Sequence, residues 1–199
     1  MKTLGFAAAA ALALLTPAVA APASQTITFT MAPSPGAATC LKNARATVID
    51  HSFGDFENLE VLVRGLPPNT DFDLFTIQVP NAPFGLAWYV GDIVTDDKGI
   101  GVGNFVGRFN VETFIVSPGA VTPPPQVHLT PPFPDATVGV KTAPIHTYHL
   151  GLWFNSPEDA KKANCSDAIT PFNGVHKAGI QVLNTDAFPA AKGPLFQLK

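Results

Sequence analysis

The stretch Thr26-Ile27-Thr28-Phe29-Thr30-Met31 alternates strictly between threonine and a large apolar residue. Successive side chains of a β-strand point to opposite faces of a sheet, so Ile27, Phe29 and Met31 would share one face and the threonines the other. The alternation therefore predicts a half-buried strand whose threonine face meets water.

The same style continues along the chain. Further strands are predicted over residues 44–48, 59–64, 71–79, 86–94, 100–109, 111–116, 146–154 and 179–183. Gly, Pro, Asn and Asp gather between them at residues 65–70 and 96–99, as is typical of turns. Many short strands at this spacing are typical of a β-sandwich or a barrel. We predict an all-β fold, a single antiparallel β-sandwich of immunoglobulin-like or jelly-roll type.

Within residues 71–79 the apolar phase changes. Phe72 and Leu74 alternate with aspartates, whereas Phe75 and Ile77 take the other phase of the alternation. A slip of one residue inside a strand is what a β-bulge produces, so a bulge is predicted here.

Two other segments do not follow the strand pattern. Residues 157–163 are predicted to form one short helix, because Ser156 suits an N-cap, Pro157 suits the first helical position and Asp159 suits a capping box. Residues 117–134 contain seven prolines. Proline cannot donate a ladder hydrogen bond, so this stretch is predicted to be a long proline-rich excursion over the surface.

Residues 1–20 have the pattern of a cleaved signal peptide. Lys2 supplies a positive charge, residues 6–15 are apolar, and Ala18-Val19-Ala20 offers small residues to a signal peptidase. Cleavage would leave one domain, residues 21–199, secreted to the extracellular space or the periplasm. The alternative is an uncleaved membrane anchor, although the apolar run is shorter than the roughly 20 residues that a span needs.

The charge limits the expected partners, and the cysteine content indicates the compartment. The chain has 12 Lys and Arg residues and 15 Asp and Glu residues, for a net charge of −3. Phosphate binding needs clustered basic residues, so no nucleic-acid partner is expected, and no membrane partner is expected after cleavage. In an oxidising compartment Cys40 and Cys165 are predicted to form one disulfide. The alternatives are two free thiols or an intermolecular bridge.

Residues 66–74, Leu-Pro-Pro-Asn-Thr-Asp-Phe-Asp-Leu, resemble the strand-to-strand corner of fibronectin type III and related immunoglobulin-like domains. There a Leu-x-Pro-x-Thr-x-Tyr pattern packs a leucine and an aromatic ring across the corner. Here one extra residue separates Pro67 from Thr70, or Pro68 takes the place of the motif proline. Phe72 replaces the tyrosine, so the hydroxyl bond of the family is lost. The resemblance implies a sandwich with binding loops at its ends, and no chemistry.

The sequence lacks the common catalytic motifs. It contains no Gly-x-Ser-x-Gly elbow, no His-Glu-x-x-His and no glycine-rich phosphate loop. Asp50-His51-Ser52 has the residue types of a catalytic triad, but neighbours in a strand point to opposite faces and cannot form one among themselves. No catalytic residue and no cofactor is therefore predicted. The alternative is a secreted hydrolase with a site assembled from scattered His and Asp.

Metal ligation has weak candidates. His146 and His149 are three residues apart, which places them on opposite faces of a strand, so chelation would need a bulge or a ligand such as His128 or His51 from another strand. Hydrogen-bonded structural histidines are the simpler interpretation. Acids near turns that would suit calcium, or a solvated surface, are Asp71, Asp73, Asp92, Asp96 and Asp97.

The aromatic residues are the best functional candidates. Phe84, Tyr89 and Trp153 are the predicted ligand-binding residues, because exposed rings suit stacking on a sugar or a protein hot spot. The alternative is that both faces of their strands are buried. We expect a non-catalytic binding or surface-interaction role outside the cell, with an extracellular protein or a carbohydrate as the ligand. The other alternative is a metal or small-ligand carrier that uses His146 or His149.

Overall fold

The computed structural model describes residues 24–54, 56–82, 84, 87–109, 146–171 and 177–198. The predicted signal peptide (1–20), the strand predicted over 111–116 and the proline-rich stretch 117–134 with His128 lie outside these residues.

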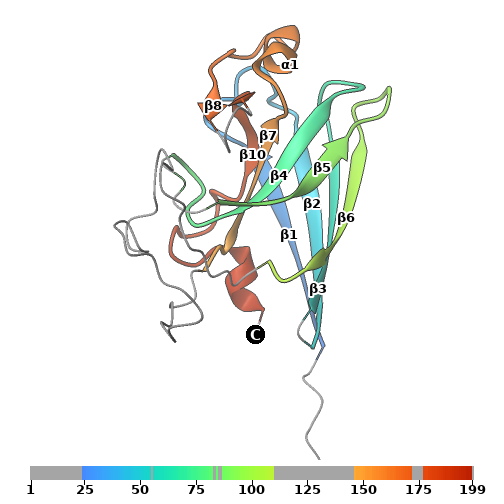
Figure 1. The fold of residues 1–199 in the computed structure, drawn as a ribbon, viewed down its shortest axis with the longest axis vertical. Coiled ribbons are helices and arrows are strands. Elements are labelled where there is room, and N and C mark those ends of the chain that lie inside the picture. The colour runs from blue at the N-terminus through green and yellow to red at the C-terminus, as the bar shows by residue number, and fades with distance from the viewer. Residues whose placement is uncertain are drawn as a thin grey trace, which may run out of the picture.

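The described chain is mainly antiparallel β-structure, which confirms the predicted fold class (Figure 1). Eight strands form one sheet in the order β5-β4-β7-β10-β1-β2-β3-β6. Their bounds are β1 Gln25–Pro33, β2 Arg45–Phe53, β3 Phe56–Arg64, β4 Asp71–Ile77, β5 Ala87–Val94, β6 Gly101–Gly107, β7 His149–Phe154 and β10 Gln181–Asn184. The smaller elements are α1 (Pro157–Lys162), the two-stranded sheet of β8 (Thr170–Pro171) and β9 (Lys177–Ala178), and a 3-10 helix, η2 (Pro194–Gln197).

The eight-stranded sheet bends into two layers that enclose the core. We call β1, β2, β3 and β6 the β2 layer, and β5, β4, β7 and β10 the β4 layer. The layers are joined where the end of β1 pairs with β10, at Ala32 and Pro33. On the other side of the sheet, β5 lies against β6. Gly91 of β5 is so close to Phe105 of β6 that any side chain at Gly91 would collide with the Phe105 ring. The sheet is therefore continuous and nearly closed.

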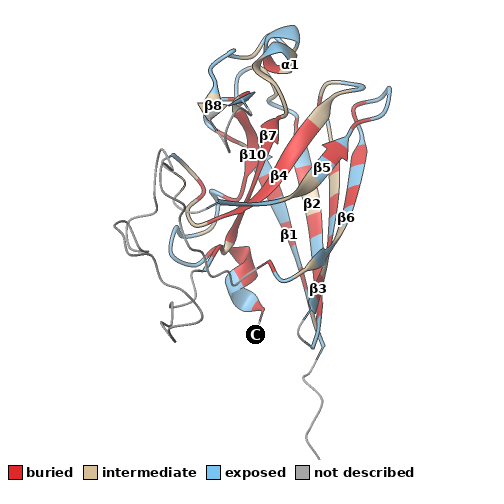
Figure 2. Cartoon of the chain, in the orientation of Figure 1, coloured by how far each residue is buried: buried red, intermediate tan, exposed pale blue. Residues whose placement is uncertain are grey.

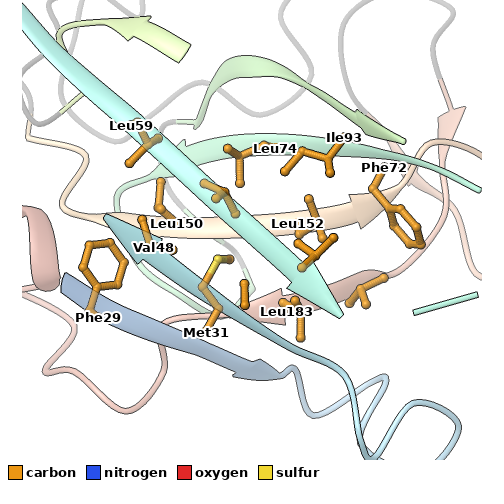
Figure 3. Close-up of a cluster of buried hydrophobic side chains, with 14 of the residues drawn as sticks. Phe29, Met31, Val48, Leu59, Phe72, Leu74, Ile93, Leu150, Leu152 and Leu183 are labelled. Carbon is orange, nitrogen blue, oxygen red and sulfur yellow. The ribbon is translucent and has the colours of Figure 1, made fainter. Parts of the chain in front are cut away.

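The β2 layer follows the predicted alternation. The pairing of β1 with β2 and of β2 with β3 runs without a register shift. Ile27, Phe29 and Met31 are buried and the threonines between them are exposed. Val48 and Leu59 meet these residues in the core, together with Leu150 and Leu183 of the β4 layer (Figure 3). The apolar face is buried because the other layer covers it.

The phase change in β4 has a cause that the sequence did not reveal. Pairing with β5 does shift register between Leu74 and Phe75, but the extra residue, Val90, lies on β5. Pairing with β7 continues uninterrupted from Phe72 to Ile77. All of β4 after Asp71 is buried, so its outer face as well as its inner face is covered (Figure 2). Apolar residues therefore occur in both phases.

Two local predictions are confirmed. The hydroxyl of Ser156 accepts a hydrogen bond from the backbone N–H of Asp159 at 3.1 Å and caps α1. Cys40 and Cys165 form a disulfide with their Cα atoms 5.4 Å apart, and it ties the segment after β1 to the segment after α1. Such a bond belongs to an oxidising, non-cytoplasmic compartment. Of the helices in the described residues, none has the length and apolar character to span a membrane.

Candidate ligand-binding site

His149, one of the two predicted metal candidates, is a buried structural residue. Its Nδ1 lies 2.9 Å from the hydroxyl of Thr185 and its Nε2 lies 3.1 Å from the carbonyl of Ala190. Both ring nitrogens are therefore engaged. Burial lowers the pKa of the imidazole below its ordinary value, against the raising effect of these hydrogen bonds.

The other described histidines lie apart from it. His146 is exposed and stacks on the ring of Tyr148, with centroids 4.8 Å apart. His51 lies on the outer face of the β2 layer, where its Nδ1 is 2.6 Å from the hydroxyl of Thr26. Asp50 and Ser52 alternate with it and are buried on the inner face. The strand therefore places His51 on the opposite face from Asp50 and Ser52.

The described part of the chain brings together no group of three or more His, Cys, Asp or Glu side chains that could hold a metal ion. Of the five turn aspartates, Asp96 shapes the β5–β6 turn, since its carboxylate accepts from the N–H groups of Lys98 and Ile100 at 2.9 and 2.8 Å. These bonds lower its pKa. Asp71, Asp73 and Asp92 lie on β4 and β5 beside Tyr89.

The three predicted ligand-binding aromatics do come together, and a fourth ring joins them. Tyr89 meets Phe75 at 5.5 Å between centroids, Phe75 meets Trp153 at 5.5 Å, and Trp153 meets Phe84 at 5.1 Å. All three contacts are edge-to-face, which is a favourable arrangement for aromatic pairs. We call these four residues the aromatic row. It lies on the outer face of the β4 layer.

Strand register builds the aromatic row. Phe75 of β4 pairs with Tyr89 of β5 on one side and with Gly151 of β7 on the other. Trp153 points to the same face as Gly151, and any side chain at Gly151 would collide with the indole ring. The missing side chain lets the indole lean along β7 toward Phe75. Ala178 of β9 completes the apolar cluster.

The aromatic row runs from a buried end to an open end. Trp153 is 1% exposed and Phe75 is 7% exposed, whereas Tyr89 is 47% exposed. Phe84 is partly buried against Trp153. Trp153 is therefore a support rather than a contact surface, and Tyr89 is the ring that a ligand can reach.

Tyr89 also has a fixed polar group. Its hydroxyl donates to the carboxylate of Asp92 at 2.6 Å. Burial, this hydrogen bond and the charges of Asp92, Asp73 and Asp71 raise the pKa of the phenol, so it stays neutral. Asp92 itself is exposed. The arrangement offers an aromatic face with an oriented hydroxyl and a carboxylate at its edge.

Phe75 was missed as a site residue in the sequence. Its signal was the change of apolar phase after Leu74, which we interpreted only as a bulge. A strand that is apolar in both phases can equally have two covered faces. Here the outer face is covered because Phe75 packs in one apolar cluster with Trp153, Phe84 and Ala178.

Comparison with known proteins finds no family whose sequence model the chain matches, no similar curated protein and no similar solved structure. The resemblance of residues 66–74 to a fibronectin type III corner stays a prediction.

Proposed function

We propose that this chain is a secreted, non-catalytic protein that binds a carbohydrate outside the cell through Tyr89. The observation that carries the proposal is the half-exposed Tyr89 ring, supported from behind by the buried part of the aromatic row and bonded to Asp92.

The chemistry of this surface suits a sugar. Sugars present apolar C–H faces that stack on aromatic rings, and hydroxyl groups that donate to carboxylates. Tyrosine combines an apolar body with a polar tip, which is why it is favoured at such wet contacts. Tyr89 supplies the face and the exposed carboxylate of Asp92 supplies an acceptor at its edge.

The site is also held in one geometry before a ligand arrives. Phe75 and Trp153 are buried in the covered β4 layer, so Tyr89 rests against side chains that cannot easily move. The bond to Asp92 fixes the phenol. A contact group that is already ordered loses little conformational entropy on binding.

Secretion is part of this proposal. The disulfide belongs to an oxidising compartment, and residues 1–20 have the pattern of a cleaved leader. N-terminal sequencing of the exported protein should begin at Ala21. An uncleaved N-terminus would contradict this part of the proposal without affecting the sugar site.

The binding proposal is tested on a glycan array, followed by calorimetric titration of the best oligosaccharide. We expect Tyr89→Ala to weaken binding at least tenfold, which corresponds to about 1.4 kcal/mol. Tyr89→Phe keeps the ring but removes the hydroxyl bonded to Asp92, so it should weaken binding by a smaller factor.

The matched control is Phe196→Ala. Phe196 is 46% exposed, much like Tyr89, but it lies on η2 and contacts Tyr148. This variant should bind as the wild type does. Equal affinity in the wild type and Tyr89→Ala, with both proteins folded by circular dichroism, would overturn the proposed site. An array without any bound glycan would overturn the ligand class.

A further inference from the structure

Asp50 is a carboxyl group inside the hydrophobic core. It lies on the inner face of β2 and is 0% exposed. Its paired neighbours across the sheet are Ile27 on β1 and Leu59 on β3, both apolar. Within the described part of the chain, neither of its carboxyl oxygens has a hydrogen-bond partner. An ionised carboxylate in such surroundings is costly, and a buried acid usually takes up a proton instead.

A second buried carboxylate lies on the same inner face. Glu57 of β3 is 4% exposed and pairs with Ser52 of β2. Ser52 is the next inward-facing residue after Asp50 on β2. Its Oε2 accepts a hydrogen bond from the backbone N–H of Phe109 at 2.6 Å. Hydrogen bonds to a carboxylate favour the charged form. Of the two acids, Glu57 thus has a hydrogen bond that favours its charged form, and Asp50 has none among the described residues.

The charged groups around Asp50 can be named for the described residues. Apart from Asp50 and Glu57, the described inward positions of β1, β2, β3 and β6 carry no charged side chain. Of the buried titratable side chains described in the β4 layer, Asp73 on β4 and His149 on β7 both lie on the outer face, away from Asp50. His51 faces outward and Arg108, after β6, is exposed. Glu57 is therefore the charge that acts on Asp50.

Burial and the charge of Glu57 shift the pKa of Asp50 in the same direction. Burial first, and then the charge of Glu57, raise the pKa of Asp50 to about 7. Two nearby carboxylates in a place of low polarity do not ionise together easily.

We propose that Asp50 is a proton-operated switch in the core, which keeps the β2 layer tightly packed while its carboxyl is neutral and weakens that layer when the proton leaves to solvent. This inference is independent of the sugar site, which lies on the outer face of the other layer.

The direction in which stability changes with pH follows from the pKa of Asp50 in the folded chain and in the unfolded chain. Below about pH 4 an aspartate holds its proton in both the folded and the unfolded chain, so Asp50 does not penalise folding. Above that pH the unfolded chain loses the proton while the folded chain keeps it, and stability falls with each pH unit. Above about pH 7 both states are ionised and the loss is complete.

The test is urea unfolding of the full secreted chain from pH 4 to pH 8. Between pH 4 and pH 8 we expect ionisation of Asp50 to lower the folding equilibrium constant by a factor of up to about a thousand. A difference of about three pKa units between the folded and the unfolded chain corresponds to three powers of ten. Asp50→Asn should lack this fall and be more stable than the wild type at pH 8. Asp97→Asn, which changes an exposed acid in the β5–β6 turn, should keep the wild-type slope.

Identical pH dependence in the wild type and Asp50→Asn would overturn the proposal, as would a lower stability of Asp50→Asn at pH 8. If this variant does not fold, carboxyl ¹³C NMR of the unaltered protein decides. A resonance assigned to Asp50 that titrates near neutral pH supports the switch, and titration near pH 4 refutes it. Hydrogen exchange at pH 5 and pH 8, expressed as protection factors that correct for the rise of the intrinsic exchange rate with pH, should show the loss of protection at pH 8 concentrated in β2 and β3.

Discussion

The β2 layer and the β4 layer have the same backbone architecture but opposite relations to water. In β2 and β3, buried positions alternate with intermediate or exposed ones, whereas β7 is buried at every position and β4 at every position after Asp71 (Figure 2). One face of the β2 layer meets water, while the central strands of the β4 layer are covered on both faces. The comparison shows that alternation of polar and apolar residues indicates that one face of a strand meets water. A strand that is covered on both faces lacks the alternation.

The side chains that cover the outer face of the β4 layer also form the candidate site. Trp153 and Phe75 would be isolated surface rings if the outer face of the β4 layer were wet. Because Phe84 and Ala178 cover them, they form a fixed base for Tyr89. A surface that binds by stacking needs such a base, since a mobile ring loses entropy when the ligand fixes it.

The largest expected effect concerns the link between the layers. Replacing Cys40 and Cys165 by serine opens a loop of sequence separation 125 and should lower the free energy of unfolding by about 4–5 kcal/mol. Urea unfolding of the double variant measures this. A loss below about 1 kcal/mol would show that the β1–β10 pairing and the shared core hold the layers together without the bond.

The next effect compares the two outer faces directly. Trp153→Ala removes a fully buried ring from the β4 layer and should cost about 3–5 kcal/mol. Ile49→Ala changes a residue that is 38% exposed on the outer face of the β2 layer, and should cost less than about 1 kcal/mol. Thermal unfolding of both variants checks the difference. Equal costs would mean that the outer faces do not differ in burial as described.

The smallest effect is a difference in pH response. His149 is buried neutral in the β4 layer, and its lowered pKa means that the unfolded chain takes up a proton before the folded chain does. Stability should therefore fall as the pH drops below about 6.5, the ordinary histidine value. His149→Gln should reduce this acid-side loss in melting experiments, with His146→Gln as the exposed control. An unchanged acid-side slope would contradict the assignment.

Much of the β2 layer was predictable. The alternation of Ile27, Phe29 and Met31 with threonines gave the strand, its faces and its place in the core. The cap at Ser156 and the disulfide were also predicted correctly, because capping is local and two cysteines in an oxidising compartment have one intramolecular pairing.

The candidate site was predictable only in part. Phe84, Tyr89 and Trp153 were singled out by type, but periodicity could not say which ring would be open, since Tyr89 and Trp153 both lie on the outer phase of their strands. The role of Phe75 depends on Gly151, a partner 76 positions away in the chain that leaves room for the indole. The strand predicted over residues 44–48 ended before Asp50, whereas β2 extends to Phe53 and buries this carboxyl in the core.

The amino-acid order alone determined the local features: strands, one capped helix, turns and the supply of a single cysteine pair. These depend on side chains within a few residues of one another, and their physics is complete without the rest of the chain. Only the tertiary structure decided which faces are dry, which ring meets solvent and which carboxyl is buried. Burial is a property of what covers a residue, and here the covering groups come from distant parts of the sequence.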